Sequence, residues 1–487
     1  MISFCIGLVI LVVGYLFYSP FIERLFGPTD QPTPAVRFND HMDFVPMSTR
    51  RVALIQLLNI AGMGPLLGAI QGILFGPIAF ILIPLGCVLM GGVHDYLCGM
   101  ISLRNDGMQV TGLIQRYLGK YHYYLFLIVV SIMLLLLAGV FVYTSGDVLA
   151  EVYFKQHDFS LNNPVMIIIY GVITAYFIMA AVFPIDKIIG RFYPIFGFLL
   201  IVGTIAIMIG LLISQVPLQE INFKQLNQHP QHLALIPFFF MTVSCGLLSG
   251  FHSTQSTIVS RTIQHEREGR TIFFGMMCLE SLIAMIWAAG AMAVYNLQLV
   301  PPEHIGRVHV LNVITKTFVP YIITLIVTAT IVILPITSGD TALRSLRLAL
   351  TEALQMKATS KRKILALMFP ILLAMIGIVV WAKHDLDSFN VIWRYFTFVN
   401  QVIAVLTFCY ATVFLYQRGK TVWPTLIPAI FYIFVTISFI SNNKIGLGLS
   451  QTVSYIIASL ASGASVIWLI WWMKDYKQKN PLDPAKL

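Results

Sequence analysis

The sequence predicts an all-α polytopic membrane protein of about 13 transmembrane helices, built as two inverted five-helix repeats with extra flanking helices. Three observations lead to this prediction. Hydrophobic residues make up 58% of the 487 residues and charged residues only 11%, whereas a soluble domain carries about a quarter charged residues. Apolar segments of membrane-spanning length recur along the whole chain. Two of them, in corresponding places, are interrupted by glycine and polar residues.

The apolar segments are separated by short polar loops, none of which is long enough for a folded domain. They lie at 1–22, 52–75, 77–103, 123–150, 164–183, 193–215, 235–260, 270–298, 319–342, 364–382, 390–416, 423–442 and 446–473. The first segment has no basic region before it, so we interpret it as a span and not as a cleavable signal.

These segments divide the chain into four parts. Residues 1–51 form an N-terminal transmembrane helix and a cytoplasmic linker, and residues 52–215 form the first five-helix repeat. Residues 235–416 form the second repeat, and residues 423–487 form two C-terminal helices and a basic cytoplasmic tail. An odd number of spans in each half turns the second half upside down relative to the first, which is the plan of many secondary transporters.

Lysine and arginine are concentrated in alternating loops, which orients the chain in a membrane. Since basic loops stay in the cytoplasm, we expect a multi-pass protein of the cytoplasmic membrane with its N-terminus outside and its C-terminus inside. The net charge of +10 then reflects topology and predicts no nucleic-acid partner. The six cysteines lie in apolar runs without a CxxC pair, which argues against a disulfide framework or a thiolate metal site.

The first interrupted segment contains Ala61-Gly62-Met63-Gly64-Pro65. Proline removes an amide hydrogen and clashes with the preceding turn, and glycine lets the backbone leave the helix at little cost. A kink or a small-residue packing face would explain this motif alone. The second interruption, in the other half, favours a binding site, because a broken helix is tolerated at membrane depth only where it is packed in protein or lines a cavity.

The second interruption is expected around Ser249-Gly250-Phe251-His252, within the polar run that extends to Ser256. Hydroxyl, amide and imidazole groups at membrane depth need partners or water. Helix–helix hydrogen bonding, or the cytoplasmic end of the span, would also explain the run. A histidine among hydroxyls can bind an anionic substrate or relay a proton.

Other polar groups lie inside predicted spans and suggest ion sites. The hydroxyls of Thr337 and Ser338, with a carbonyl near Ala61, are hard oxygen ligands suited to sodium. His94 and Asp95 suggest a structural ion pair, a proton relay or two metal ligands. The candidates for a proton relay are His252, Asp95, Asp340 and Glu280, because ionisable residues within a membrane are commonly functional. Each of them also has a structural explanation when it is considered singly.

Several separate motifs resemble those of the carbon starvation protein A family, in the family's order and from about residue 50 to 415. They are Asn59–Gly68, Gly91-Gly92-Val93-His94-Asp95, Ser102–Gly107, Ser249–Ser256, Thr337–Leu343 and Trp393-Arg394-Tyr395-Phe396 through Asn400-Gln401. The resemblance implies a transporter of peptides or pyruvate that scavenges nutrients during carbon starvation, in the amino acid–polyamine–organocation superfamily. It also implies a leucine-transporter-like fold, whose two broken core helices match the two interruptions.

We therefore expect a secondary active importer and not an enzyme. The half-helix ends would bind the substrate carboxylate, helped by their dipoles. The predicted substrate residues are Gly62, Met63, Gly64, Gly250, Phe251, His252, Ser253, Gln255 and Asn400. The coupling ion would be sodium at Ala61, Thr337 and Ser338, or a proton. We predict no other cofactor.

The predicted partners are the lipid bilayer and a solute with a carboxylate, and a homo-oligomer is allowed. A nutrient sensor or a channel is the alternative to a transporter, and a membrane metal-dependent enzyme at His94 and Asp95 is a weaker one. The sequence leaves open the choice between peptide and pyruvate, the coupling ion, the oligomeric state and the role of the first and last helices.

Overall fold

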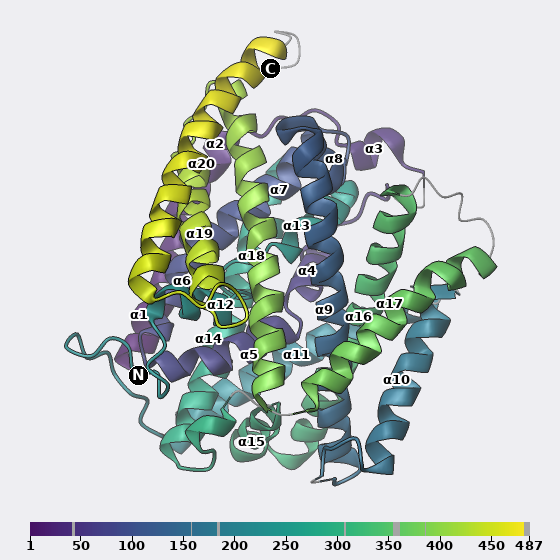
Figure 1. Ribbon diagram of the computed structural model, residues 1–487, viewed down its shortest axis with the longest axis vertical. Coiled ribbons are helices and arrows are strands. Elements are labelled where there is room, and N and C mark those ends of the chain that lie inside the picture. The colour runs from purple at the N-terminus through teal and green to yellow at the C-terminus, as the bar shows by residue number, and fades with distance from the viewer. Residues whose placement is uncertain are drawn as a thin grey trace.

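The computed structural model describes residues 1–40, 44–156, 158–182, 186–305, 308–353, 361–384 and 386–481. Among these residues every regular element is a helix. Ten of these helices are long and apolar enough to cross a membrane, or eleven if one bent pair counts as a single span. The prediction of an all-α polytopic membrane protein is therefore confirmed (Figure 1), but the ten or eleven spans among the described residues are fewer than the 13 or so predicted.

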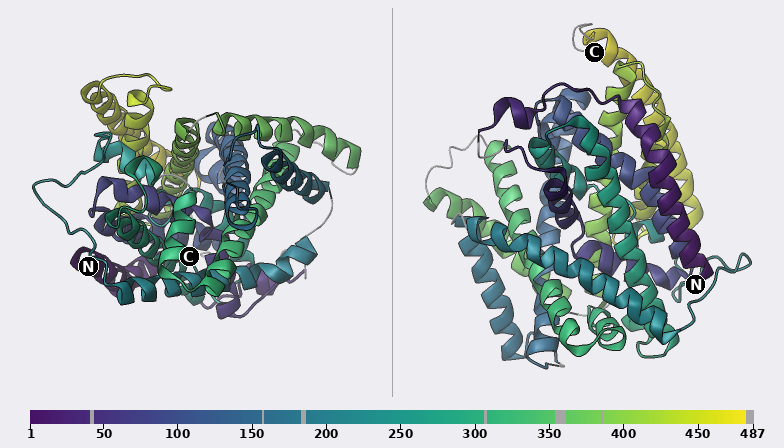
Figure 2. Two further views of the ribbon diagram at one scale, coloured as in Figure 1. Left: turned by 90° about the horizontal axis from the view of Figure 1, so that it is seen from below. Right: turned by 180° about the vertical axis from the view of Figure 1, so that it is seen from behind.

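The first five-segment half begins with a broken helix and continues with longer helices. It comprises α4 (Thr49–Ile60) with α5 (Met63–Gly72), α6 (Ala79–Gly86) running into α7 (Gly92–Arg104), α9 (Lys120–Tyr153), α10 (Pro164–Val182) and α11 (Asp186–Ser214). The short helix α8 (Val110–Leu118) precedes α9. Helix α11 crosses the bundle diagonally in the rear view (Figure 2).

The second half follows the same order of elements. It comprises α12 (Phe240–Thr242) and α13 (Phe251–Val259) around a break, then α14 (Met276–Asn296), α16 (Tyr321–Ala353), α17 (Lys361–Ala382) and α18 (Leu386–Gln417), with α15 (His309–Phe318) as a connector. Each of these two groups of helices therefore begins beside a break in the helical backbone. The division into two five-helix repeats stays a prediction. The inverted relation of the two halves stays a prediction.

Helices at both ends of the chain flank this core. They are α1 (Ile2–Val13), α2 (Ser19–Phe26), α19 (Trp423–Asn442) and α20 (Gln451–Lys479). Although they are far apart in sequence, α2 and α19 are neighbours, because the ring of Phe21 stacks on Trp423 with centroids 5.6 Å apart. The two termini lie at opposite ends of the bundle (Figure 1).

The segment between α2 and α4, which contains the short helix α3 (Pro34–Phe38), packs against the loop that follows α13. The hydroxyl of Thr33 donates to the carbonyl of Ile263 at 2.5 Å, and the N–H of Thr29 donates to Glu266 at 2.6 Å. The Arg267 side chain hydrogen-bonds and pairs with Asp30, which lowers the pKa of that carboxyl. These contacts attach the segment to the loop that follows α13, at the end of the second broken helix.

Glycines let α5 pack closely against the second break. Gly64, Gly68 and Gly72 repeat every fourth residue and therefore lie on one face of the helix. A Cβ built on Gly68 would lie 3.1 Å from the carbonyl oxygen of Thr242, and one on Gly72 would lie 2.6 Å from Val243. A Cβ on Gly64 would overlap Cys245. The two breaks are in contact because this face carries no side chains.

We expect Gly68→Val to destabilise the protein by about 1–3 kcal/mol, because overpacking forces the neighbouring backbone to move. The measurement is thermal unfolding of the purified protein in detergent. Gly377→Val is the matched control, because a Cβ at Gly377 on α17 would have nothing within 4 Å. Equal losses in the two variants would show that α5 and the second break are not closely packed.

Candidate substrate and ion site

The first break lies between α4 and α5, whose axes meet at 53°. Ala61 (φ −82°, ψ 53°) and Gly62 (φ −83°, ψ −145°) leave the helical conformation. Pro65 falls in the first turn of α5, where its missing N–H costs no intrahelical hydrogen bond. The first-turn amides at Met63 and Gly64 lack an intrahelical acceptor by position. The glycine–proline motif therefore starts a second half-helix.

The second break is longer and begins earlier than the sequence indicated. Residues 243–250 are not helical, and α13 begins at Phe251. Gly246 has a φ of +84°, a left-handed conformation that glycine adopts without strain. His252, Ser253 and Gln255 consequently lie in the first turns of α13 and not in the break. Their role as substrate residues stays a prediction.

Side chains of α18 hydrogen-bond to the backbone around the second break. Asn400 accepts from the N–H of Phe251 at 2.6 Å and donates to the hydroxyl of Ser249 at 3.0 Å. Gln401 donates to the carbonyl of Leu248 at 3.0 Å, and the indole of Trp393 donates to the carbonyl of Thr242 at 3.2 Å. The Asn400 side chain thus has partners within the protein and caps α13. Its predicted contact with substrate remains untested.

Three of the four candidates for a proton relay meet in one buried cluster. The Nδ1–H of His252 donates to Asp95 Oδ2 at 3.0 Å, and His252 Nε2 lies 3.7 Å from Glu280 Oε1. The N–H of Gly246 donates to Glu280 Oε1 at 3.2 Å, so this carboxylate also supports the unwound backbone. The fourth candidate, Asp340, is buried on α16. Proton transfer by any of them stays a prediction.

His94 joins the same cluster, as its Nδ1 lies 2.8 Å from Asp95 Oδ1. Cys245, which was not among the predicted site residues, lies there too. Its Sγ is within 4.8 Å of donor atoms of His252 and Glu280. A cysteine in an apolar run has the pattern of a core residue, so only the folding of the break reveals its position.

One hydroxyl of the predicted sodium site faces the first break. A Cβ built on Gly62 would lie 4.0 Å from the Ser338 hydroxyl oxygen on α16. The side chain of Thr337 lies outside the described residues. Ala61, the predicted carbonyl ligand, is buried beside Gly62. The fold therefore brings α16 to the first break, and sodium binding there stays a prediction.

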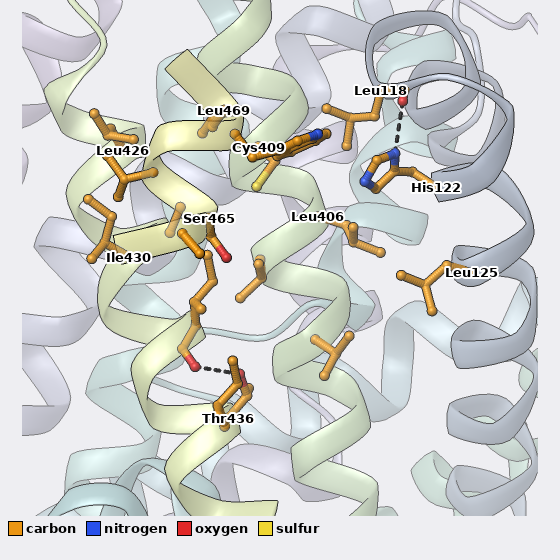
Figure 3. A pocket seen from close by; sticks show the side chains of 18 of the residues that line it. Leu118, His122, Leu125, Leu406, Cys409, Leu426, Ile430, Thr436, Ser465 and Leu469 are labelled. Atoms are coloured by element: carbon orange, nitrogen blue, oxygen red, sulfur yellow. Dashed lines mark hydrogen bonds between the residues drawn. The ribbon is translucent and has the colours of Figure 1, made fainter. Parts of the chain in front are cut away.

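An apolar cavity of about 620 Å³ lies elsewhere, between α9, α18, α19 and α20. Figure 3 shows side chains such as Leu406, Ile430 and Leu469 along it, with His122 at one end. Among the described residues that line it, none belongs to either break. Such an apolar cavity suits lipid tails and not a charged solute.

Comparison with known proteins identifies the family. The model of the family "Carbon starvation protein CstA" matches residues 1–153, 142–308 and 304–439. The chain therefore belongs to the CstA family of membrane transporters, which are not enzymes. A Haemophilus influenzae protein named "Uncharacterized membrane protein" is 35% identical over 339 residues, which cover 60% of this chain and 90% of that one.

Two more distant relatives carry functional names. The peptide transporter CstA of Campylobacter jejuni is 25% identical over 57% of this chain and 48% of its own length. The pyruvate/proton symporter BtsT of Escherichia coli is 26% identical over 61% of this chain and 50% of its own length. The chain thus spans about half the length of these two transporters.

Solved structures share the fold at low sequence identity. A manganese transporter of Eremococcus coleocola matches with a TM-score of 0.55 and 12% identity, over 88% of this chain and 94% of that one. The inward-facing conformation of Mhp1 matches with a TM-score of 0.50 and 14% identity, over 90% and 93%. These neighbours support the leucine-transporter-like architecture and say nothing of the substrate.

We expect Asn400→Ala to lower the stability of the substrate-free protein by about 1–3 kcal/mol, because it leaves the half-buried N–H of Phe251 without its acceptor. Thermal unfolding in detergent measures this loss. Gln451→Ala, which removes an exposed hydrogen bond to Tyr455, is the control and should change little. Unchanged stability of Asn400→Ala would contradict the capping role.

Proposed function

We propose that this member of the CstA family is a secondary active transporter that imports a small carboxylate-bearing solute, either a peptide or pyruvate, across the cytoplasmic membrane. The observation that carries the proposal is the contact between two broken helices, one from each half, around the glycine face of α5. Irregular backbone at membrane depth is characteristic of transporter binding sites. The peptide and pyruvate transporters among the relatives favour the same substrate classes.

The end of α5 is the better place for the substrate carboxylate. At the start of α13, the N–H groups of Phe251, His252 and Ser253 donate to Asn400, Ser249 and Gly250 within the protein. At α5, the amides of Met63 and Gly64 begin a helix whose dipole favours an anion. Gly62, which is half-buried and whose added Cβ would meet only the Ser338 hydroxyl at 4.0 Å, leaves room for a small ligand beside this backbone. We therefore place the carboxylate at the first break, with α13 supplying the opposite wall.

The coupling ion that we favour is sodium, at the same break. Carbonyl groups released at Ala61 and Gly62, with the hydroxyls of Ser338 and Thr337, would provide hard oxygen ligands beside the carboxylate. A bound cation would then attract the anionic substrate directly, which couples the two binding events. A proton is the second candidate, because one relative is named a pyruvate/proton symporter.

Alternating access would move the two broken helices relative to the remaining helices around this fixed site. With basic loops in the cytoplasm, the N-terminus is outside and the C-terminus inside. A carrier of this kind serves nutrient scavenging during carbon starvation. A channel or a sensor would lack uptake that saturates with substrate and follows an ion gradient.

Uptake by the purified protein in liposomes tests the proposal. Labelled pyruvate and a labelled dipeptide would each be offered with an inward sodium gradient, an inward proton gradient or neither. We expect one substrate to accumulate only with one gradient, because a symporter draws its driving force from the ion. If folded, inserted protein accumulates neither substrate, this proposal of peptide or pyruvate import is wrong.

We expect Thr337→Ala combined with Ser338→Ala to abolish sodium stimulation of uptake, because two of the proposed ligands are lost. Initial rates over a range of sodium concentrations measure the effect. Thr317→Ala, an exposed hydroxyl bonded to its own helix at Val313, is the control. A sodium dependence equal to that of the unmodified protein would rule out this ion site.

A further inference from the structure

The buried cluster at the second break contains three kinds of metal-binding atom. Cys245 from the unwound segment, His252 from α13 and Glu280 from α14 each offer one donor atom, and these atoms all lie within 4.8 Å of one another. Cys245 is 6% exposed, and His252 and Glu280 are 0% exposed. Their sequence separation shows that the fold, and not a local motif, brings them together.

The orientation of His252 is that of a metal-ligating histidine. A carboxylate only accepts hydrogen bonds, so the contact of His252 Nδ1 with Asp95 at 3.0 Å requires the proton on Nδ1. With its proton on Nδ1 directed at Asp95, the ring has Nε2 left to bind a cation, and this atom lies 3.7 Å from Glu280 Oε1. Histidine ligands usually donate their other ring N–H to a carboxylate, which fixes the ring for the metal.

Two donor atoms in this cluster have no hydrogen-bond partner within the described part of the chain. They are His252 Nε2 and Glu280 Oε2, and both are buried at membrane depth. Unsatisfied polar atoms are costly there. A metal ion that replaces the proton on Nε2 would pair with both atoms.

The charges of the cluster also favour a cation. Asp95 and Glu280 are two carboxylates in the same buried region, and the basic side chains that contact them among the described residues are His94 and His252 alone. Buried carboxylates are usually paired with a cation or coordinate a metal. One divalent ion would offset the charge of both.

We propose that Cys245, His252 and Glu280 bind one divalent transition-metal ion of the zinc class, with Asp95 holding His252 in place. The mixed sulfur, nitrogen and oxygen donors suit zinc or cobalt, whereas magnesium and calcium select oxygen ligands alone. Three protein ligands leave a fourth coordination position open. The metal connects the unwound segment to α13 and α14 and so fixes the shape of the second break.

The ligand set differs from the metal site predicted at His94 and Asp95. One carboxylate oxygen of Asp95 contacts His94 and the other accepts a hydrogen bond from His252. We therefore assign Asp95 the role of orienting His252 and not that of a metal ligand. The proposal does not depend on which solute is carried, because it concerns a metal ion bound at the second break and not the transported substrate.

Cobalt(II) is the probe, added to the full-length purified protein in detergent after treatment with a chelator. We expect one equivalent to bind, with the absorption of a cobalt–thiolate bond and the intense visible bands of a four-coordinate site. Zinc should displace it. Metal analysis of the protein as purified gives a second readout of occupancy.

Variants assign the ligands. Cys245→Ser should remove the thiolate band, and Glu280→Gln should weaken cobalt binding at least about ten-fold. Asp95→Asn should weaken it about 10–100-fold, as expected for a group that supports a histidine ligand. Cys409→Ser is the matched control, because Cys409 lies in the apolar cavity of Figure 3, and it should bind cobalt as the unmodified protein does.

Folded unmodified protein that binds neither cobalt nor zinc would overturn the proposal, as would binding that these three variants leave unchanged. If Cys245→Ser does not fold, Glu280→Gln and Asp95→Asn still test the site, since both preserve side-chain shape. Metal binding is measured without transport, so its failure would leave the proposed import of a carboxylate untouched.

Discussion

The rest of this structure depends on one requirement, namely that backbone N–H and C=O groups released at membrane depth find partners inside the protein. The second break meets this requirement with side chains from other helices. Asn400, Gln401 and Trp393 on α18 bond to its backbone, and Glu280 on α14 receives the N–H of Gly246. The positions of α14 and α18 are therefore tied to the unwound segment, and the buried polar groups of the core gather where the helix is interrupted.

The sequence was sufficient to predict an all-α membrane protein and the first break. Hydrophobic segments are set by the bilayer itself, and a glycine–proline motif disrupts a helix locally, so both can be recognised without tertiary information. The ends of the second break could not be predicted in the same way. Its unwinding begins at Val243, in an apolar stretch, because α18 and the left-handed Gly246 stabilise it.

The residues of the candidate site were predicted individually, but their contact with one another was not. Asp95, His252 and Glu280 each stood out as ionisable residues within a span, but nothing in the sequence indicated that they meet. Their contact depends on how α7, α13 and α14 pack, and Cys245 enters the cluster only because the backbone around it is unwound. Ser338 was selected for its hydroxyl, and its position facing Gly62 follows from the course of α16. Residue type thus identified candidates, whereas tertiary packing determined which of them share a site.

The glycine face of α5 has a consequence for movement. Interlocking side chains resist sliding, because each must leave one hollow before it enters the next. Gly64, Gly68 and Gly72 present smooth backbone to the unwound segment, so a small displacement along this contact breaks few side-chain contacts. We therefore expect the same surface that brings the two half-helices together to permit small shifts of α5 along the unwound segment without separating the two breaks.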